Sequence, residues 1–213
     1  MAWSAENATK AFLRTLKLGK NKVAAPDVAE FVSALAAGGG ARLLVDVPAG
    51  PAGPTTLALL TAAQQTGGRA ACIVRGPEEL RASIEFLGPE LTAPVNLVVG
   101  DAARLLPAGA DFVLVDCRLE NHARVFGAAQ AGAAEAGGGL VVVRNAALCD
   151  LPAVEGSGGG LRVDLLPIGG GLRVCRVLTA ARRIQWVVRV DECTGEEHVF
   201  RITSPRKKWI EAS

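Results

Sequence analysis

Residues 42–66 read RLLVDVPAGPAGPTTLALLTAAQQT, and this stretch decides the fold. It starts as an apolar run at 42–47, passes through a segment rich in Gly and Pro, and continues as an apolar stretch behind Pro54. Proline is favoured in the first turn of a helix, where its missing N–H costs little. We therefore predict a buried strand at 42–47 and a helix at 55–66, which together form the first half of a βαβ unit.

The same alternation continues along the chain. Further apolar runs of strand length are separated by stretches with helical character, and a helix at 26–37 that ends at Gly38-Gly39-Gly40 precedes them. Nearly continuous apolar strands are typical of parallel sheets whose two faces are covered by helices. We predict an α/β, Rossmann-like doubly wound, mostly parallel sheet. Its remaining strands are expected at 70–75, 95–100, 111–117 and 139–145, and its remaining helices at 77–87 and 120–136.

The pattern changes after residue 145. The segment LRVDLLPIGGGLRVCRV (161–177) contains two strand-like runs around Gly169–Gly171, which predicts an antiparallel hairpin added to the sheet. RIQWVVRVDECTGEEHVFRIT (183–203) predicts a further hairpin. We expect a Rossmann-like domain at 1–180 that begins with two N-terminal helices. A C-terminal β-hairpin extension and basic tail at 181–213 are expected to pack on the same domain.

Composition excludes several classes of protein. Half of the 213 residues are hydrophobic and 21% are charged, which excludes a disordered chain, and no apolar run is long enough to span a membrane. The formal net charge of +2 does not by itself imply a polyanionic partner. Five scattered cysteines without a C-x-x-C pair predict buried, reduced thiols, and no secretory signal is evident, so we expect an intracellular protein, cytoplasmic or nuclear.

The turn after the first strand is the first candidate site. Gly50 and Gly53 lie between Asp46 in the strand and Thr55 at the helix start. In nucleoside sites such a turn lets the backbone approach the ligand and offers N–H groups from the helix N-terminus. Three prolines in the loop (48, 51 and 54) have no N–H, so a rigid connection without ligand is the alternative.

The ends of the second and third strands supply two further candidates. Arg75 stands where an acidic residue normally receives ribose hydroxyls; it could attract a phosphate instead, or be a solvated strand end. Asp101, followed by Ala102, could accept a hydrogen bond from an adenine amine or cap a short helix. Both alternatives stay open for each residue.

Asp116 and Asn145 end neighbouring strands and could therefore share one site. A divalent cation needs several oxygen ligands, and Arg144 would place positive charge against it. His122 is interpreted as a packed or solvated residue. The sequence contains no G-x-S-x-G elbow, Walker loop, H-E-x-x-H or paired-cysteine motif, so hydrolase and kinase functions lack a nucleophile or a phosphate loop.

Over residues 40–178 the order of segments resembles the metal-dependent O-methyltransferases of plants and animals that act on catechols and caffeoyl-CoA. The resemblance is carried by DVPAGPAGPTTLALLTAA, VVGDAARLL, DFVLVDCRLENH, and GGLVVVRNAAL followed by LLPIGGGLRVCRV. The N-terminal stretch MAWSAENATKAFLRTLKLGK is similar to an uncharacterised plant methyltransferase-like family. The resemblance implies an S-adenosylmethionine site formed by Asp46, Gly50, Gly53, Thr55, Arg75, Asp101, Ala102 and Asp116.

The chain departs from the active enzymes at several positions. In those enzymes a metal is held by an Asp after strand four and an Asp-Asn pair after strand five; this chain has Asp116 and Asn145, but Arg144 replaces the second Asp. Arg118-Leu119 stands where a Lys follows the same motif, and only Ala147–Gly160 remain of a long insert that helps to form the substrate pocket. We therefore expect no metal and no metal-dependent reaction.

Three functions remain open. The chain could bind S-adenosylmethionine, with or without a metal-free methyl transfer. It could instead be an inactive Rossmann-like binding or scaffold module with a protein partner, contacted through Trp186, Trp209 and Arg206–Lys208. A weak nucleic-acid binder is the third hypothesis, suggested by a run of basic residues with no acidic residue among them: Lys10, Arg14, Lys17, Lys20 and Lys22. A homodimer stays open, and no membrane is expected as a partner.

Overall fold

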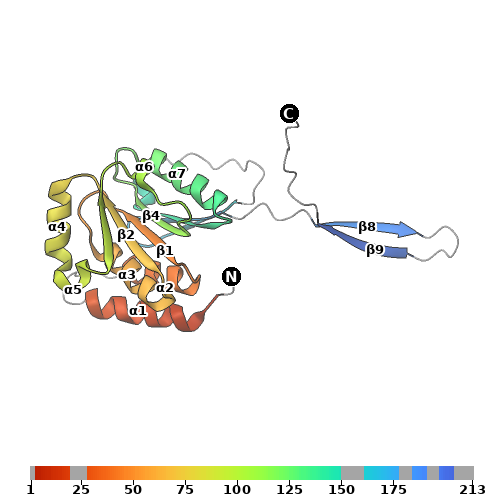
Figure 1. The fold of residues 1–213 in the computed structure, drawn as a ribbon, viewed down its shortest axis with the longest axis horizontal. Helices are drawn as coiled ribbons and strands as arrows, with labels where there is room; N and C mark the ends of the chain where they lie inside the picture. The colour runs from red at the N-terminus through yellow and green to blue at the C-terminus, as the bar shows by residue number, and fades with distance from the viewer. Residues whose placement is uncertain (1–2, 20–27, 150–160, 178–183, 191–196, 204–213) are drawn as a thin grey trace, which may run out of the picture.

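The fold is a seven-stranded, mostly parallel sheet between two layers of helices (Figure 1). The computed structural model describes residues 3–19, 28–149, 161–177, 184–190 and 197–203. The strand order is β3-β2-β1-β4-β5-β7-β6. The order reverses between β1 and β4, which is the topological switch point where doubly wound folds place their ligands.

Five parallel strands form the centre of the sheet, as predicted, and their bounds agree with the sequence to within a residue. They are β1 (Leu43–Val47), β2 (Arg69–Val74), β3 (Val95–Val99), β4 (Phe112–Asp116) and β5 (Gly139–Arg144). The predicted hairpin extends this sheet: β7 (Leu172–Val177) pairs antiparallel with β5, and β6 (Leu161–Leu166) pairs antiparallel with β7 at the edge.

The helices also follow the predicted pattern. They are α1 (Ala5–Gly19), α2 (Val28–Gly38), α3 (Pro54–Thr66), α4 (Pro77–Leu87), α5 (Pro89–Thr92), α6 (Ala102–Leu105) and α7 (His122–Glu135). The one-turn helix α5 and the 3-10 turn η1 (Ala146–Leu148) were not predicted, because a single turn carries too little periodicity to be recognised.

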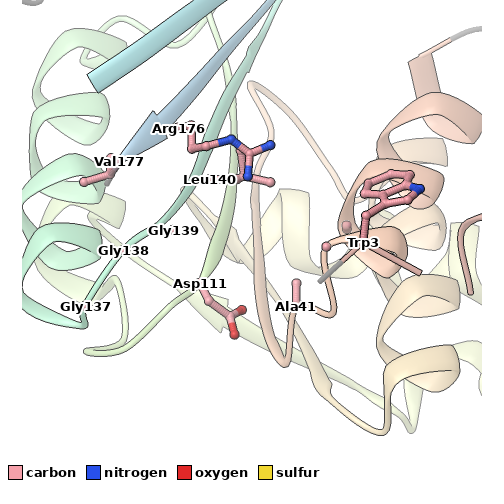
Figure 2. A pocket seen from close by; sticks show the side chains of 11 residues that line it. Trp3, Ala41, Asp111, Gly137, Gly138, Gly139, Leu140, Arg176 and Val177 are labelled. Atoms are coloured by element: carbon pink, nitrogen blue, oxygen red, sulfur yellow. The ribbon is translucent and has the colours of Figure 1, made fainter. Parts of the chain in front are cut away.

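The amino edge of the sheet is held by Asp111, the residue before β4. Its carboxylate accepts hydrogen bonds from the backbone N–H of Arg42 at 3.0 Å and of Leu43 at 2.9 Å, at the start of β1. Asp111 also lines a pocket of ≈ 310 Å³ at this edge, together with Trp3 and Arg176 (Figure 2). The Asp111 side chain thus links the starts of β1 and β4, which are neighbours in the sheet.

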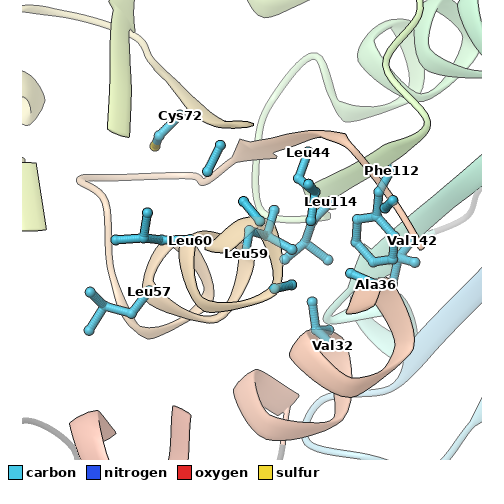
Figure 3. Close-up of a cluster of buried hydrophobic side chains, with 14 of the residues drawn as sticks. Val32, Ala36, Leu44, Leu57, Leu59, Leu60, Cys72, Phe112, Leu114 and Val142 are labelled. Atoms are coloured by element: carbon cyan, nitrogen blue, oxygen red, sulfur yellow. The ribbon is translucent and has the colours of Figure 1, made fainter. Parts of the chain in front are cut away.

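Side chains alternate between two cores, one on each face of the sheet. On β4, Phe112 and Leu114 point toward α2 and α3, whereas Val113 and Val115 point toward α7. Figure 3 shows the first core, in which Phe112 and Leu114 pack with Leu44, Leu59 and Val32. The continuous apolar character of the strands follows from this double burial, because a strand covered on both faces has no polar side.

The remaining two strands form a sheet of their own. β8 (Ile184–Val190) pairs antiparallel with β9 (Glu197–Thr203), which confirms the predicted second hairpin. The basic segment 206–208, Trp209 and Cys193 lie outside the described residues. Packing of the 181–213 extension on the main domain stays a prediction.

The cysteines correct one expectation from the sequence. Cys72 and Cys175 are buried free thiols, as predicted, but Cys117 and Cys149 are joined in a disulfide with their Cα atoms 6.1 Å apart. Parallel strands end at the same edge of the sheet, so Cys117 after β4 and Cys149 after η1 meet there. A separation of 32 residues gives no sign of this proximity.

None of the helices in the described ranges combines the length and apolar character needed to cross a membrane.

Replacing Asp111 by alanine should lower the free energy of unfolding by about 1–3 kcal/mol, because it leaves the N–H groups of Arg42 and Leu43 without their acceptor. Urea denaturation of the variant and the wild type measures the difference. Glu85→Ala, at an exposed position of α4, is the control and should change stability by less than about 0.5 kcal/mol. Equal stability of Asp111→Ala and the wild type would contradict the role given to this carboxylate.

Candidate functional site

The candidate site is a pocket at the carboxyl ends of the central strands. It has a volume of ≈ 320 Å³ and is lined by the ends of β1, β2 and β3 and by the turn after β4. The lining residues are Val47, Ile73, Arg75, Gly100, Asp101, Ala102, Leu119, Glu120 and Asn121. In doubly wound sheets the loops at this edge diverge and leave a crevice at the switch point, so this position favours a ligand site.

The pocket at the opposite edge, around Trp3 and Asp111, contains none of the predicted site residues. It lies at the amino ends of the strands, where Asp111 already accepts backbone hydrogen bonds. The general position of ligand sites in such sheets therefore favours the carboxyl edge, although the two volumes are nearly equal.

Asp46, near the end of β1, is fully buried beneath the start of α3. Its Oδ2 accepts hydrogen bonds from the hydroxyls of Thr55 at 3.0 Å and Thr56 at 2.7 Å. Its Oδ1 has no hydrogen-bond partner among the described residues. Burial raises the pKa of Asp46, and the charge of Arg144 and the two threonine hydroxyls oppose that rise only in part. Asp46 thus has a buried oxygen without a partner among the described residues, and it lies behind the residues that line the pocket rather than among them.

The loop between β1 and α3 offers few N–H donors, as its sequence predicted. Pro48, Pro51 and Pro54 have none. The N–H of Ala52 donates to Ser83 Oγ at 2.8 Å, and that of Gly53 donates to Thr56 Oγ1 at 3.2 Å. The amides left for a ligand in this loop are those of residues 49 and 50.

Space above the loop is open. A Cβ atom built on Gly50 or Gly53 would meet no atom within 4 Å. Gly53 has φ −146°, an extended conformation that any residue adopts. Neither glycine is required by the packing of the chain, so a role for them must come from something that approaches the loop from outside.

Arg75 lies at the predicted position after β2 and lines the pocket. Its Nη2 is 3.5 Å from Glu79 Oε1 on the first turn of α4, and its side chain is half exposed. An exposed pair at this distance contributes little stability. The guanidinium therefore stays available to a ligand at the edge of the pocket.

Asp101 caps α6, which confirms one of the two interpretations of this residue. Its Oδ1 accepts from the N–H of Ala103 at 3.2 Å, and its Oδ2 lies 2.5 Å from Arg124 Nη2 and 3.7 Å from Arg104 Nε. Ala102, the next residue, is buried against the pocket. The cap does not exclude a ligand, because Asp101 stays one-third exposed at the pocket wall.

Asp116 is fully buried at the end of β4 and is surrounded by donors. Asn145 Nδ2 donates to its Oδ1 at 2.8 Å, Arg118 Nη2 donates to its Oδ2 at 2.9 Å, and Arg144 Nη2 lies 2.6 Å from the same Oδ2. Burial alone would raise the pKa of Asp116. The hydrogen bonds from Arg118 and Asn145 and the charge of Arg144 outweigh burial and hold this pKa below its usual range.

This arrangement does not fit a divalent cation. Hard cations take several oxygen ligands, whereas the carboxylate of Asp116 is already shared by two guanidinium groups. Arg144 stands opposite Asp116 in the register of β4 and β5, so its positive charge lies against the carboxylate. The residues present therefore hold a buried ion pair at this position.

Asn145 is the non-glycine residue with positive φ (58°) among those described. Ala146 and Ala147 donate backbone hydrogen bonds to the carbonyls of Gly171 and Gly170, at 2.9 and 3.1 Å. A Cβ atom on Gly170 would lie 2.7 Å from Asn145 Oδ1. The glycines of the β6–β7 turn thus allow this turn to pack directly on the Asn145 segment.

Some residues of the site were not found from the sequence. Arg118 was identified only as a replacement for lysine, and Arg124 and Ser83 were not predicted as site residues. Arg118 pairs with Asp116, and Arg124 pairs with Asp101. Ser83 accepts a hydrogen bond from the loop between β1 and α3, which we call the Gly-Pro loop (48–53). Their partners are up to 31 residues away, and sequence spacing carries no signal for such contacts. His122 does not reach this cluster in any described contact; its ring lies near Cys117 and Cys149.

Comparison with known proteins gives a family and a fold. A family model described as "Protein of unknown function (DUF1442)" matches residues 1–202. No curated protein matches the sequence. Among the solved structures that share the fold are several methyltransferases.

A methyltransferase from Geobacter sulfurreducens is 18% identical, with a TM-score of 0.59 over 79% of this chain and 89% of that chain. The methyltransferase PaMTH1 of Podospora anserina, bound to S-adenosylhomocysteine, is 14% identical, with a TM-score of 0.57 over 82% and 89%. The O-methyltransferase TomG of Streptomyces achromogenes, in complex with S-adenosylmethionine, is 17% identical, with a TM-score of 0.51 over 84% and 92%. At these identities the likeness establishes the Rossmann-like methyltransferase fold, as the sequence predicted.

Acidification should destabilise the protein through Asp116. Because the pKa of Asp116 is lower in the folded than in the unfolded chain, its contribution is present above the unfolded value of about 3.9 and is lost as the pH falls through the folded value. Thermal unfolding between about pH 5 and pH 2 should therefore fall more steeply for the wild type than for Asp116→Asn. Parallel curves for the two proteins would rule out this contribution.

The Arg144→Asp substitution should create the cation site that the wild type lacks. It replaces the partly exposed guanidinium with a carboxylate opposite the buried Asp116, and without metal it should cost about 3–5 kcal/mol because the buried carboxylate loses its partner. Magnesium at about ten times its Kd should restore about 1.4 kcal/mol to the variant. Thermal unfolding with and without MgCl2 measures both effects, and the wild type is the control that should not respond. A variant indifferent to magnesium would contradict the role given to Arg144 in excluding the cation.

Proposed function

The chain belongs to the DUF1442 family of proteins of unknown function, and we propose that it binds S-adenosylmethionine or S-adenosylhomocysteine at its carboxyl-edge pocket without metal-dependent methyl transfer. The observation that carries this proposal is the contrast between the two halves of one sheet edge. Over β1, β2 and β3 a cavity of ≈ 320 Å³ is open, whereas at the ends of β4 and β5 Asp116 is held by two arginines.

The cavity at the ends of β1, β2 and β3 suits a nucleoside. Val47, Ile73 and Leu119 supply apolar walls for a base, while Asp101 supplies a carboxylate at the same wall. Nucleoside pockets combine such apolar surface with a small number of polar groups that fix orientation. The shared fold of PaMTH1 and TomG, which hold S-adenosylhomocysteine and S-adenosylmethionine, supports this assignment of the ligand.

The loop between β1 and α3 suits the amino acid part of the cofactor. The open space at Gly50 and Gly53 lets a ligand approach the backbone, and two amides of the loop are left to donate to it. The cofactor would supply the reactive methyl group; the residues named here bind and orient it.

The other half of this edge, at the ends of β4 and β5, disfavours methyl transfer. Methyl transfer from a sulfonium moves positive charge away from the sulfur, and a site adapted to it offers negative or neutral groups. Here Arg118 and Arg144 place two positive charges around a single ionised carboxylate. We therefore propose a binding protein that favours the uncharged product S-adenosylhomocysteine over the cationic S-adenosylmethionine.

Nucleic-acid binding is not proposed. The basic run at 10–22 was its only support; Lys20 and Lys22 lie outside the described residues, and Lys10 forms an ion pair with Glu6 at 2.5 Å on the same exposed face of α1. This arrangement is the ordinary pattern of a solvated helix.

Calorimetric titration with S-adenosylhomocysteine and S-adenosylmethionine tests the proposal. Gly53→Val should weaken binding by about tenfold or more, about 1.4 kcal/mol, because the added side chain fills the open space above the loop. Arg75→Asp should strengthen binding by about tenfold, since an acid at this strand end accepts both ribose hydroxyls.

Gly127→Val, on an exposed part of α7 where an added Cβ also meets nothing within 4 Å, is the matched control and should bind like the wild type. Absence of heat and of any thermal shift with both ligands, in the wild type and in Arg75→Asp alike, would refute the proposal. The fold would then be assigned to a scaffold module, and protein partners would become the next question.

A further inference from the structure

Three metal-ligating side chains meet beside the candidate site without taking part in it. Cys117 follows β4, His122 begins α7, and Cys149 follows η1. Their two sulfur atoms and one imidazole nitrogen all lie within 4.8 Å of one another. None of the three lines the nucleoside pocket.

The histidine keeps one ring nitrogen free for a metal. His122 Nδ1 lies 2.7 Å from the carbonyl oxygen of Leu119, so this nitrogen donates its proton to the carbonyl and Nε2 carries the free lone pair. Histidines that bind metals usually donate their second N–H to a carbonyl or carboxylate in this way. The backbone supports the arrangement, because the N–H of His122 also donates to Leu119 O, at 3.2 Å.

The two cysteines are spaced for either a disulfide or a shared metal. Their Cα atoms are 6.1 Å apart. Two thiolates bound tetrahedrally to zinc, each at about 2.3 Å, place their sulfurs about 3.8 Å apart, which rotation of the side chains allows at this Cα separation. The N–H of Cys117 is fixed by Arg144 O at 3.0 Å, so the cysteine backbone stays in place in both states.

We propose that the reduced pair Cys117 and Cys149, together with His122, binds one Zn²⁺ with water in the fourth position. A dithiol reductant supplies two electrons and two protons, which break the S–S bond and give two thiols while the reductant becomes a disulfide. Zinc then displaces both thiol protons, so two S–H bonds break, two S–Zn bonds form and two protons are released.

The donor set selects this class of metal. Thiolate and imidazole favour zinc and its relatives, whereas magnesium and calcium take oxygen ligands. Two thiolates neutralise the charge of Zn²⁺, which matters because Cys117 is only 4% exposed. His122 and Cys149 are half-buried, so solvent and metal can reach the cluster from their side.

The site has a structural consequence for the ion pair next to it. Cys117 is adjacent to Asp116, and Cys149 lies four residues after Asn145. A disulfide or a zinc ion between them fixes the ends of β4 and β5 in the arrangement that lets Asn145 donate to Asp116 at 2.8 Å. Metal binding does not depend on the proposed nucleoside site, and its readout is separate.

Cobalt titration of the full-length protein tests the proposal. After reduction and removal of the reductant under nitrogen, the wild type should take up one equivalent of Co²⁺ with a thiolate-to-cobalt charge-transfer band, and Zn²⁺ should abolish the band. The oxidised protein should show no band. Cys149→Ala should lose it, and His122→Ala should bind cobalt at least about tenfold more weakly.

Cys72→Ala and Cys175→Ala are the matched controls, because both remove buried free thiols outside the cluster and should leave the titration unchanged. Circular dichroism checks that each variant is folded, and His122→Ala alone suffices should a cysteine variant fail to fold. A reduced wild type that shows free thiols at both positions by alkylation and mass spectrometry, but gives no cobalt band, would overturn the proposal. So would a band that His122→Ala leaves unchanged in strength and affinity.

Discussion

The ion pair between Asp116 and Arg144 controls the arrangement of the whole carboxyl edge of the sheet. The two residues face each other at the ends of β4 and β5, and Arg144 Nη2 lies 2.6 Å from a carboxylate that is fully buried. An unpaired charge at this depth would cost several kcal/mol, so neither residue can be removed alone without loss. Arg118 and Asn145 complete the shell around the carboxylate and hold the loops after both strands in place.

This constraint divides the edge into two halves with different chemistry. Where β1, β2 and β3 end, the loops leave a cavity, the glycines of the first loop face open space, and the buried Asp46 keeps one oxygen unsatisfied. Where β4 and β5 end, the polar groups are used by one another. The cavity thus lies over β1, β2 and β3, while positive charge is concentrated at the ends of β4 and β5.

The cysteine cluster and the β6–β7 turn act on the same region from its outer side. The carbonyls of Gly170 and Gly171 accept hydrogen bonds from the backbone N–H groups of the segment after Asn145. The link between Cys117 and Cys149 joins the end of that segment to the end of β4. Both features flank Asn145, which adopts a left-handed conformation that asparagine tolerates better than most residues other than glycine.

The sequence by itself determined that the fold is a mostly parallel sheet with a hairpin beyond β5. It also determined the order of strands and helices along the chain, because buried parallel strands and amphipathic helices carry their periodicity locally. It also placed Asp46, Arg75, Asp101 and Asp116 at the ends of successive strands, since strand ends at one edge follow from the fold. Only the tertiary structure decided what those residues contact: that Arg118 joins Arg144 on Asp116, that Arg124 reaches Asp101 across 23 residues, and that Cys117 meets Cys149 and His122. Such contacts depend on loop conformations that bring distant residues together, and no local pattern encodes them.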